Sequence, residues 1–387
     1  MLTSARLGLL STTSRDLPES PYSAVCVVIG RGYLDDPPTF TGLAHLFEHV
    51  WFTHELSAPS VEWGETRENT VVLHHACPAD DLETVVAAVA DRLRRCGWLA
   101  DANSGAIAAA LDLIGLERRT GRDRRVSGFP RIDIARALRG DIRFDPVAVD
   151  PGTREADPLR LEVIQFAEGR PLAVSVAGPS PMAARELMAG LAQPAPRSGP
   201  DNWPRVGLLE GVWPADAGGV TACAAAWILP RTPEVAAAAW LVGGVIEKLA
   251  WPAALRWVSG RVVSAQGAAP LRGGQLYAVA AGTATTPAEG SVRLVEDYLV
   301  PALRDESLDP DVVRRVCETE ADAAELAALD AVAAVAGIDE VPCGPDEVRE
   351  AIRSADTGTL RRFGDLLADN PRAEFHAGSE SSAVARL

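Results

Sequence analysis

A proline-rich stretch near the middle of the chain sets the first limit on how it can fold. Residues 192–205, AQPAPRSGPDNWPR, contain four prolines with Gly, Ser, Asn and Asp between them, which excludes regular structure and suits a linker. The chain has 387 residues, a length that suits two domains of similar size. We therefore expect an N-terminal domain over residues 1–191, a linker over residues 192–205 and a C-terminal domain over residues 206–387.

The two halves repeat one pattern. Residues 69–98 pass from a β-rich stretch through a turn at Pro78 and Asp80 into an amphipathic helix. Residues 274–305 do the same, with Pro287 opening the helix. A second helix is expected after each of these, over residues 104–119 and 309–329. The repetition indicates an internal duplication.

Further strands complete the expected sheets. The apolar runs at residues 22–30, 171–178 and 220–229 predict strands, and residues 181–192 predict the last helix of the first half. Runs of strands beside consecutive helices are typical of α+β layers. We predict an α+β fold of two homologous half-domains, each a mainly antiparallel sheet with helices packed on one face.

The charge balance excludes one class of partner. The chain has 37 basic and 53 acidic residues, a net charge of −16, and such a surface repels the phosphates of nucleic acids. Negative charge keeps a protein in solution and can also attract a basic peptide. No stretch approaches the ~20 apolar residues of a membrane span, and the apolar run at the N-terminus is too short for a signal peptide. Six cysteines without a CxxC pair are typical of buried core residues in a reducing compartment, so we expect a cytoplasmic protein.

Residues 41–54, TGLAHLFEHVWFTH, carry three of the six histidines. Thr39 or Thr41 can cap a helix over about residues 42–53. Residues four apart on a helix lie about 40° apart, and residues three apart about 60° the other way. His45, Glu48 and His49 therefore share one face of a helix that is apolar nearly all round.

Two imidazoles and a carboxylate on a buried helix need partners, because unpaired polar burial is costly. H-x-x-E-H is the inverzincin pattern, in which two histidines hold zinc and the glutamate is the general base. The alternative is a core helix whose histidines bond to backbone carbonyls. His54 lies past the motif, and we interpret it as an ordinary histidine near the helix end. His74 and His75 fall on a predicted strand and should point to opposite faces.

The stretch TGLAHLFEHVWF resembles the signature of the M16 (pitrilysin/insulinase-type) zinc metallopeptidases, in which G-x-A-H-x-x-E-H is followed by an aromatic residue. Two-domain, M16B-like members are built from two homologous α+β halves joined by a linker. The resemblance implies zinc-assisted peptide hydrolysis, with His45 and His49 as ligands and Glu48 as the base that takes a proton from water and passes it to the leaving amine.

A catalytic zinc site needs three protein ligands and an open position. In M16 peptidases the third ligand is a glutamate some seventy residues downstream. Glu117 lies 68 residues after His49 (117 minus 49) and continues an apolar stripe of its predicted helix with Ala110 and Ile114. The resemblance thus implies Zn²⁺ bound by His45, His49 and Glu117. The alternatives are that Glu117 simply ends the stripe, or that Asp112, about 140° away around the helix, takes its place.

The sequence departs from the family pattern near the metal and on the following strand. A second glutamate usually stands seven residues before the third ligand, but this chain has Ala110. A G-x-x-N-A-x-T stretch usually forms the edge strand that pairs with the peptide by strand addition. Here Trp63 and Gly64 stand where Asn and Ala are expected, and Thr66 matches the threonine, which makes it a candidate substrate-binding residue.

A third departure lies in the second half. Many active members use an arginine and a tyrosine seven apart, in a stretch like L-R-x-x-x-G-L-x-Y. LRWVSGRVV, residues 255–263, keeps Arg256 as a candidate substrate-binding residue but has Val263 in place of the tyrosine. In some two-domain pairs one subunit carries HxxEH and its partner anchors the substrate. The chain therefore resembles the zinc-bearing half of a dimer, specifically a heterodimer that encloses a chamber.

The sequence supports one function and leaves alternatives open. The first is a zinc endopeptidase that cleaves peptides or unfolded segments, for instance in the maturation of a peptide precursor. The second is a catalytically silent M16-like subunit for assembly or substrate binding, although silent members usually lose motif residues. The third is an unrelated α+β protein with a histidine-rich core helix.

Overall fold

The computed structural model describes most of the chain. The described residues are 8–37, 40–53, 56, 58–68, 70–95, 104–123, 129–140, 156–167, 171–179, 181–189, 210–215, 217, 220–230, 232–246, 253–257, 275–305, 327, 328, 331 and 345–378. The predicted linker at residues 192–205 lies outside them.

The chain divides into two compact units that exchange short segments of sequence. The first comprises Met1–Glu117, Pro146–Pro204 and Ala321–Val341, and the second comprises Arg118–Asp145, Arg205–Glu320 and Pro342–Leu387. Each unit therefore contains one stretch that belongs, by sequence, to the other half of the chain.

The first unit is built on a five-stranded sheet with the order β1-β5-β2-β4-β3. β1 runs parallel to β5, and the other neighbouring pairs are antiparallel. β3 forms one edge of this sheet, so its outer side has no strand neighbour among the described residues. The strands are β1 (Gly8–Asp16), β2 (Tyr22–Ile29), β3 (Val61–Thr66), β4 (Val71–Pro78) and β5 (Pro171–Gly178).

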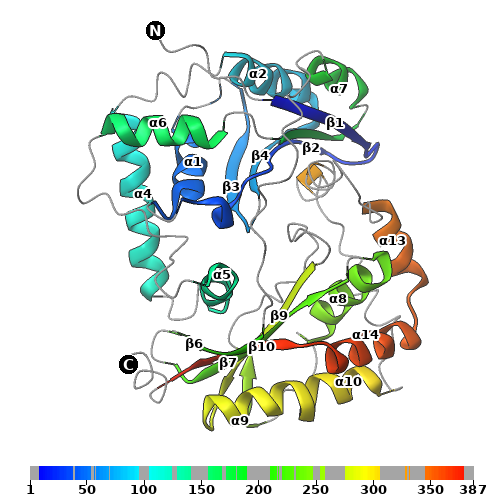
Figure 1. Ribbon diagram of the computed structural model, residues 1–387. Helices are drawn as coiled ribbons and strands as arrows, with labels where there is room; N and C mark the ends of the chain where they lie inside the picture. The colour runs from blue at the N-terminus through cyan, green and yellow to red at the C-terminus, as the bar shows by residue number, and fades with distance from the viewer. Residues whose placement is uncertain are drawn as a thin grey trace. The chain divides into compact units, whose positions relative to one another are not determined.

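Helices pack on this sheet and on one another (Figure 1). Helix α1 contacts β3, β4 and α6, while α2 contacts β2, β4 and α7. The alternate residues Ala24, Cys26 and Val28 of β2 pack instead against Ala327, Ala328 and Ala331, from the exchanged segment. The elements are η1 (Tyr33–Asp35), α1 (Leu43–Phe52), η2 (Ala79–Asp81), α2 (Leu82–Arg95), α4 (Ser104–Asp123), α6 (Ala156–Ala167) and α7 (Met182–Ala189).

The second unit repeats the topology of the first. Its five-stranded sheet has the order β6-β10-β7-β9-β8, with β10 parallel to β6 and the other pairs antiparallel. In chain order, the five strands of each sheet occupy the same places and directions. The strands are β6 (Gly211–Ala215), β7 (Ala222–Leu229), β8 (Leu255–Trp257), β9 (Gln275–Thr283) and β10 (Arg372–Ala377). The predicted α+β duplication is confirmed.

The core of the second unit lies between this sheet and its helices. Tyr277 contacts Trp227 in a tilted arrangement and Phe363 edge-to-face, with ring centroids 5.7 and 5.2 Å apart, and alanine fills much of β7 and α8. The helical elements are α5 (Arg131–Arg139), α8 (Pro233–Ile246), α9 (Pro287–Val292), the π-helical η4 (Arg293–Leu299), α10 (Val300–Arg304), α13 (Pro345–Ser354) and α14 (Thr357–Asp369).

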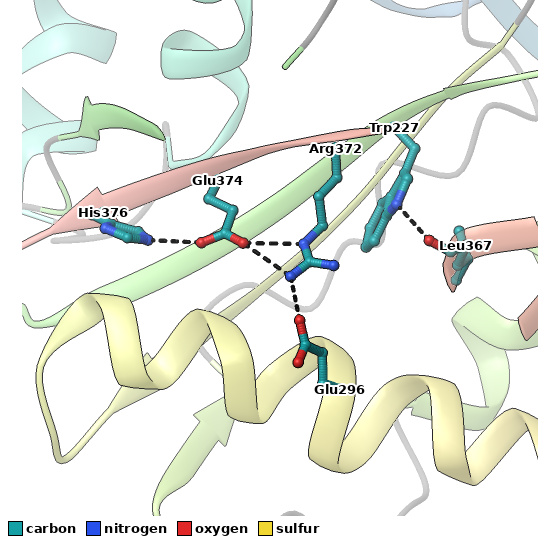
Figure 2. A network of polar contacts seen from close by, with 6 residues as sticks. All are labelled: Trp227, Glu296, Leu367, Arg372, Glu374 and His376. Carbon is teal, nitrogen blue, oxygen red and sulfur yellow. Dashed lines mark hydrogen bonds and ion pairs between the residues drawn. The ribbon is translucent and has the colours of Figure 1, made fainter. Parts of the chain in front are cut away.

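A row of charged side chains runs along β10 and reaches Glu296 of η4 (Figure 2). His376 Nε2 lies 3.2 Å from Glu374 Oε2, and Arg372 bonds to both Glu374 and Glu296. The hydrogen bond from His376, with further help from Ser291 and Arg372, lowers the pKa of Glu374 from 4.5 to about 2 against the opposing effect of burial. This carboxylate therefore favours the folded state as long as it stays ionised.

We expect Glu374→Gln to remove part of the acid sensitivity of the fold. The unfolded chain takes up a proton at this residue near pH 4.5, whereas the folded chain does so only near pH 2. The free energy of unfolding therefore falls as the pH drops from about 4.5 towards 2, by up to ~1 kcal/mol per pH unit from this group. Urea unfolding between pH 6 and 3 should be less pH-dependent in Glu374→Gln than in wild type. The exposed Glu350→Gln is the control, and equal slopes in all three proteins would contradict the assignment.

The strand and helix predictions are confirmed where the structure describes them. Predicted strand 171–178 coincides with β5, and the strand-turn-helix patterns correspond to β4-η2-α2 and to β9-α9 with its continuation through η4 and α10. The cysteines Cys26, Cys77 and Cys223 are buried, and burial raises the pKa of the Cys77 thiol to about 11. In the described part of the chain, no helix combines the length and apolar character needed to cross a bilayer.

Candidate metal centre

Helix α1 begins with a carboxylate cap from outside the helix. Its N-cap residue is Gly42, whose φ of 82° is readily adopted by glycine, and no side chain at that position makes a cap bond. Instead, the backbone N–H groups of Gly42 and Ala44 donate to the buried carboxylate of Asp36, at 2.7 and 2.9 Å. The N-cap residue is therefore Gly42 and not Thr41, and Thr39 lies outside the described residues. A charged carboxylate binds the exposed N–H groups of a helix start more strongly than a hydroxyl does.

Three polar side chains share one face of α1, as helix geometry predicts. The side chains of His45 and His49 are 13% and 12% exposed, and Glu48 is 9% exposed. The other faces are fully buried through residues such as Leu46, Phe47, Val50 and Trp51. The apolar faces thus pack the helix against the sheet. The two imidazoles lie on the face that remains partly accessible to solvent.

Glu117 on α4 meets the two histidines. Its Oε2 lies 3.2 Å from His45 Nε2 and 3.4 Å from His49 Nε2, and the two histidine Nε2 atoms lie 3.1 Å apart. Hydrogen bonds from His45 and then His49 hold the pKa of the Glu117 carboxyl well below its usual range, so it is an anion at neutral pH. The Glu117 side chain is 54% exposed, so this carboxylate lies where a polypeptide segment or water can approach.

The spacing of these three atoms fits a tetrahedral metal ion. Ligands about 2.0–2.1 Å from zinc at the corners of a tetrahedron lie about 3.3 Å from one another. The measured separations of 3.1, 3.2 and 3.4 Å match that edge length. Among the described residues, these are the ones that form a group of three or more potential ligands with donor atoms within 4.8 Å of one another. Two imidazoles and one carboxylate with a fourth corner open are a donor set found in catalytic zinc sites.

Among the described residues, few polar groups support the candidate ligands from behind. Ala110, seven residues before Glu117, is fully buried and has no oxygen in its side chain. The Nδ1 atom of His45 is buried and has no hydrogen-bond partner within the described residues. Imidazoles that bind metals usually donate this second N–H to a carboxylate or carbonyl, which orients the ring. Among the described residues, His45 has no such bond to orient its ring.

Glu48 is held between α1 and the edge strand. Thr66 Oγ1 donates a 2.6 Å hydrogen bond to Glu48 Oε2. Gly64 lets the carboxylate approach the strand, because a Cβ there would lie 2.4 Å from Glu48 Cγ and 2.8 Å from Phe52 Cε2. Thr66 and Gly64 therefore give Glu48 a fixed position beside the ligand group, and neither role was predicted from the sequence.

A buried polar network lies under the same helix. His75 Nδ1 lies 2.9 Å from Glu62 Oε1, and Trp51 Nε1 donates to His75 Nε2 at 3.4 Å. Arg92 on α2 donates to the Trp51 carbonyl and lies over the indole ring, 5.2 Å from its centroid. Burial lowers the pKa of His75, which keeps it neutral and able to accept from Trp51. The network ties β3, β4, α1 and α2 into one support for the site.

The remaining predicted residues belong to the second unit or lie outside the described residues. Arg256 lies on β8, where it pairs with Gly282 across to β9, and the structure describes its backbone only. His54 and Val263 lie outside the described residues. Helix α8 follows β7 as α1 follows β2, yet its sequence PEVAAAAWLVGGVI contains no histidine. The second unit therefore has no counterpart of the histidine pair on this helix.

Solved structures share this architecture across the whole chain. A protease from Helicobacter pylori matches 97% of this chain and 98% of its own, with a TM-score of 0.68 and 14% identity. A chain of complex III2 from Candida albicans, solved with Inz-5 bound, matches 95% of this chain and 93% of its own, with a TM-score of 0.62 and 11% identity. The peptidase M16 inactive domain from Pseudomonas fluorescens matches 95% of this chain and 95% of its own, with a TM-score of 0.59 and 12% identity. The chain has the fold of the M16 peptidases.

Sequence comparison alone gives no such match. No protein-family model matches the sequence, and no curated protein matches it either. The fold is therefore shown by structural similarity and not by sequence similarity.

Proposed function

We propose that the chain is a zinc-dependent endopeptidase that hydrolyses peptides or unfolded segments. The observation that carries the proposal is the tetrahedral spacing of His45, His49 and Glu117 with Glu48 held beside them. The M16 peptidase fold and the H. pylori protease among its structural neighbours support the same chemistry.

In peptide hydrolysis, separate residues would bind the metal and transfer the proton. His45, His49 and Glu117 would hold Zn²⁺, which, when bound, lowers the pKa of a water molecule and polarises a peptide carbonyl. Glu48 takes the proton from the attacking water and delivers it to the departing amine. Because Thr66 holds Oε2, the Oε1 atom of Glu48 is the one we assign to this proton transfer.

Substrate binding is proposed at the edge of the first sheet. The outer side of β3 can accept a peptide as an added strand, which binds main chain and tolerates varied sequences. Thr66 ends this strand and Arg256 lies on the edge strand of the second sheet, so both remain proposed substrate-binding residues. The hydrogen bond from Thr66 to Glu48 adds a positioning role to the first of them.

Removing metal is the experiment that tests the proposal. An unstructured peptide of mixed sequence should be cut internally by the zinc-loaded protein, and 1,10-phenanthroline should abolish cleavage. Added zinc should restore it, because the ligands persist without the ion. Mass spectrometry of the fragments reports the cut sites. Cleavage that continues at the same rate in the chelator would contradict the proposal.

Thr66 offers a second test. Thr66→Val keeps the shape of the side chain but removes the hydrogen bond to Glu48, and we expect kcat to fall by about 10- to 100-fold. KM should change less, because the bond orients a reacting group. Thr66→Ser, which keeps the hydroxyl, should recover most of the rate. Equal rates for the valine and serine variants would show that Thr66 does not position Glu48.

We further propose that a second M16-like subunit completes the chamber. Val263 replaces the tyrosine expected with Arg256, so this chain has one half of that substrate-anchoring pair, and a partner subunit would supply the other half. One structural neighbour is a chain of a multi-subunit complex. Such a cytoplasmic heterodimer could mature a peptide precursor. Full-rate cleavage by this chain alone, unchanged by a partner, would rule out the heterodimer.

A catalytically silent subunit is the alternative. It is supported by the inactive domain among the structural neighbours. It is disfavoured because all four motif residues are present, with His45, His49 and Glu117 gathered at one place and Glu48 on the same helix as the two histidines. A chain that binds zinc yet leaves the peptide uncut both alone and with its partner subunit would favour the silent role.

A further inference from the structure

The edge strand carries a stacked pair of rings on the sheet face opposite α1. Glu62, Gly64 and Thr66 of β3 point to α1 and its supporting network, so Val61, Trp63 and Glu65 point to the other face. Trp63 lies directly opposite His74 in the antiparallel register. The indole and imidazole planes are 6° from parallel, with centroids 4.6 Å apart.

This stack leaves one aromatic surface accessible. Trp63 is 36% exposed, whereas His74 beneath it is 3% exposed. Since His74 covers one side of the indole, the exposed area belongs to its outer side and edge. A large aromatic ring fixed by stacking and open to solvent on its other side is a preformed surface for a planar or cationic group.

A carboxylate stands next to this surface. Glu65 lies two residues along the strand on the same face, and its side chain is 37% exposed. Its Oε1 lies 3.8 Å from His74 Nε2, and Arg67 contacts Oε2 at 2.7 Å. Because Arg67 already offsets part of this charge, the indole provides the main attraction for a cation. Glu65 and the net charge of −16 add a negative potential.

The surface lies one residue from the proposed catalytic group. Gly64, between Trp63 and Glu65, is the residue against which Glu48 packs. A peptide added to β3 as a strand would present alternate side chains to the two faces of the sheet. The side chains on the face away from Glu48 would therefore reach Trp63 while the backbone runs past Thr66.

We propose that Trp63, assisted by Glu65, forms a subsite for an arginine side chain of the peptide substrate; this inference rests on the proposed peptidase function. A guanidinium is planar and cationic, so it can stack on the indole and face the carboxylate at once, which a lysine ammonium does less well. Trp63 would thus determine which basic peptides bind productively.

Binding of matched peptides tests the subsite. Fluorescently labelled, unstructured peptides that differ only by arginine or its neutral isostere citrulline are titrated into zinc-loaded Glu48→Gln protein, which should not cut them. We expect the arginine peptide to bind about tenfold more tightly. Adding Trp63→Ala should reduce the ratio to about one, and Trp63→Phe should keep part of it. Val61→Thr, on the same face of the same strand, is the control and should leave the ratio unchanged.

Two results would overturn the subsite. One is equal affinity for arginine and citrulline peptides in the presence of Trp63. The other is an arginine preference that survives Trp63→Ala in protein whose circular dichroism matches wild type. Tighter binding of a phenylalanine peptide than of the arginine peptide would also reject the cationic ligand. A cleavage assay separates failure of the subsite from failure of the proposed function. If arginine-dependent binding is seen but the wild-type protein with its partner subunit does not hydrolyse the peptide, only the peptidase function is contradicted. If the peptide is hydrolysed without any preference for arginine, only the subsite is contradicted.

Discussion

Glu48→Gln is expected to lower peptide hydrolysis by about 10²- to 10⁴-fold while zinc stays bound, because the substitution removes a general base but not a ligand. The glutamine keeps the size of the side chain, and its amide oxygen can still accept the hydrogen bond from Thr66. The proposed zinc ligands are His45, His49 and Glu117, so the metal content should not change.

Single-turnover assays at saturating peptide, with zinc measured on the same samples, check this expectation. Glu83→Gln, an exposed carboxylate on α2, is the matched control and should cleave at the wild-type rate. Unchanged turnover in Glu48→Gln would rule out this residue as the base. Loss of both zinc and turnover would instead mean that Glu48 helps to hold the metal.

Glu117→Ala is expected to weaken zinc binding by more than about 100-fold, because one of three ligands is removed from the group. Two imidazoles would remain, with His45 lacking a hydrogen-bond partner for its Nδ1 atom among the described residues. The fold should survive, since the Glu117 side chain is 54% exposed and packs little.

Competition with a chromophoric chelator gives the zinc affinity, and thermal unfolding reports the fold. Asp112→Ala makes a sharp comparison, because Asp112 is exposed on the same helix and points about 140° away from Glu117. Its zinc affinity should equal that of wild type. If Asp112→Ala weakened zinc as much as Glu117→Ala, the assignment of the third ligand would be wrong.

The fold could be predicted where the pattern is local. Residues 171–178 form an apolar run bounded by Pro171 and Gly178, and the strand has those bounds. β10 was not predicted, although the alternation of Arg372, Glu374 and His376 with buried neighbours is the pattern of a half-buried strand. β1 was not predicted either, since its polar residues gain strand structure from parallel pairing with β5, more than 150 positions later. Residues 321–341 belong to the first unit, where Ala327, Ala328 and Ala331 pack against β2, and local sequence does not encode a contact between such distant parts of the chain.

In the candidate site, too, local features could be predicted from the sequence and contacts between separate elements could not. His45, Glu48 and His49 share a face because of helix spacing, and this could be predicted from five residues. Glu117 was inferred as the third ligand from the resemblance to M16 peptidases, and in the structure its carboxylate lies within 3.4 Å of both histidines. The cap by Asp36 and the contact of Thr66 with Glu48 depend on how η1 and β3 lie against α1. Such contacts between separate elements have no signature in the order of residues.

Zinc K-edge absorption on the full-length protein, with zinc content measured on the same sample, tests the central claim most directly. The account predicts about one zinc per chain, with two imidazole nitrogens and one carboxylate oxygen about 2.0–2.1 Å from the ion and one further light-atom ligand. Glu117→Ala should lose the protein oxygen or the metal altogether. A chain that takes up no zinc at a stoichiometric level, or that binds it through cysteine sulfur, would contradict the account.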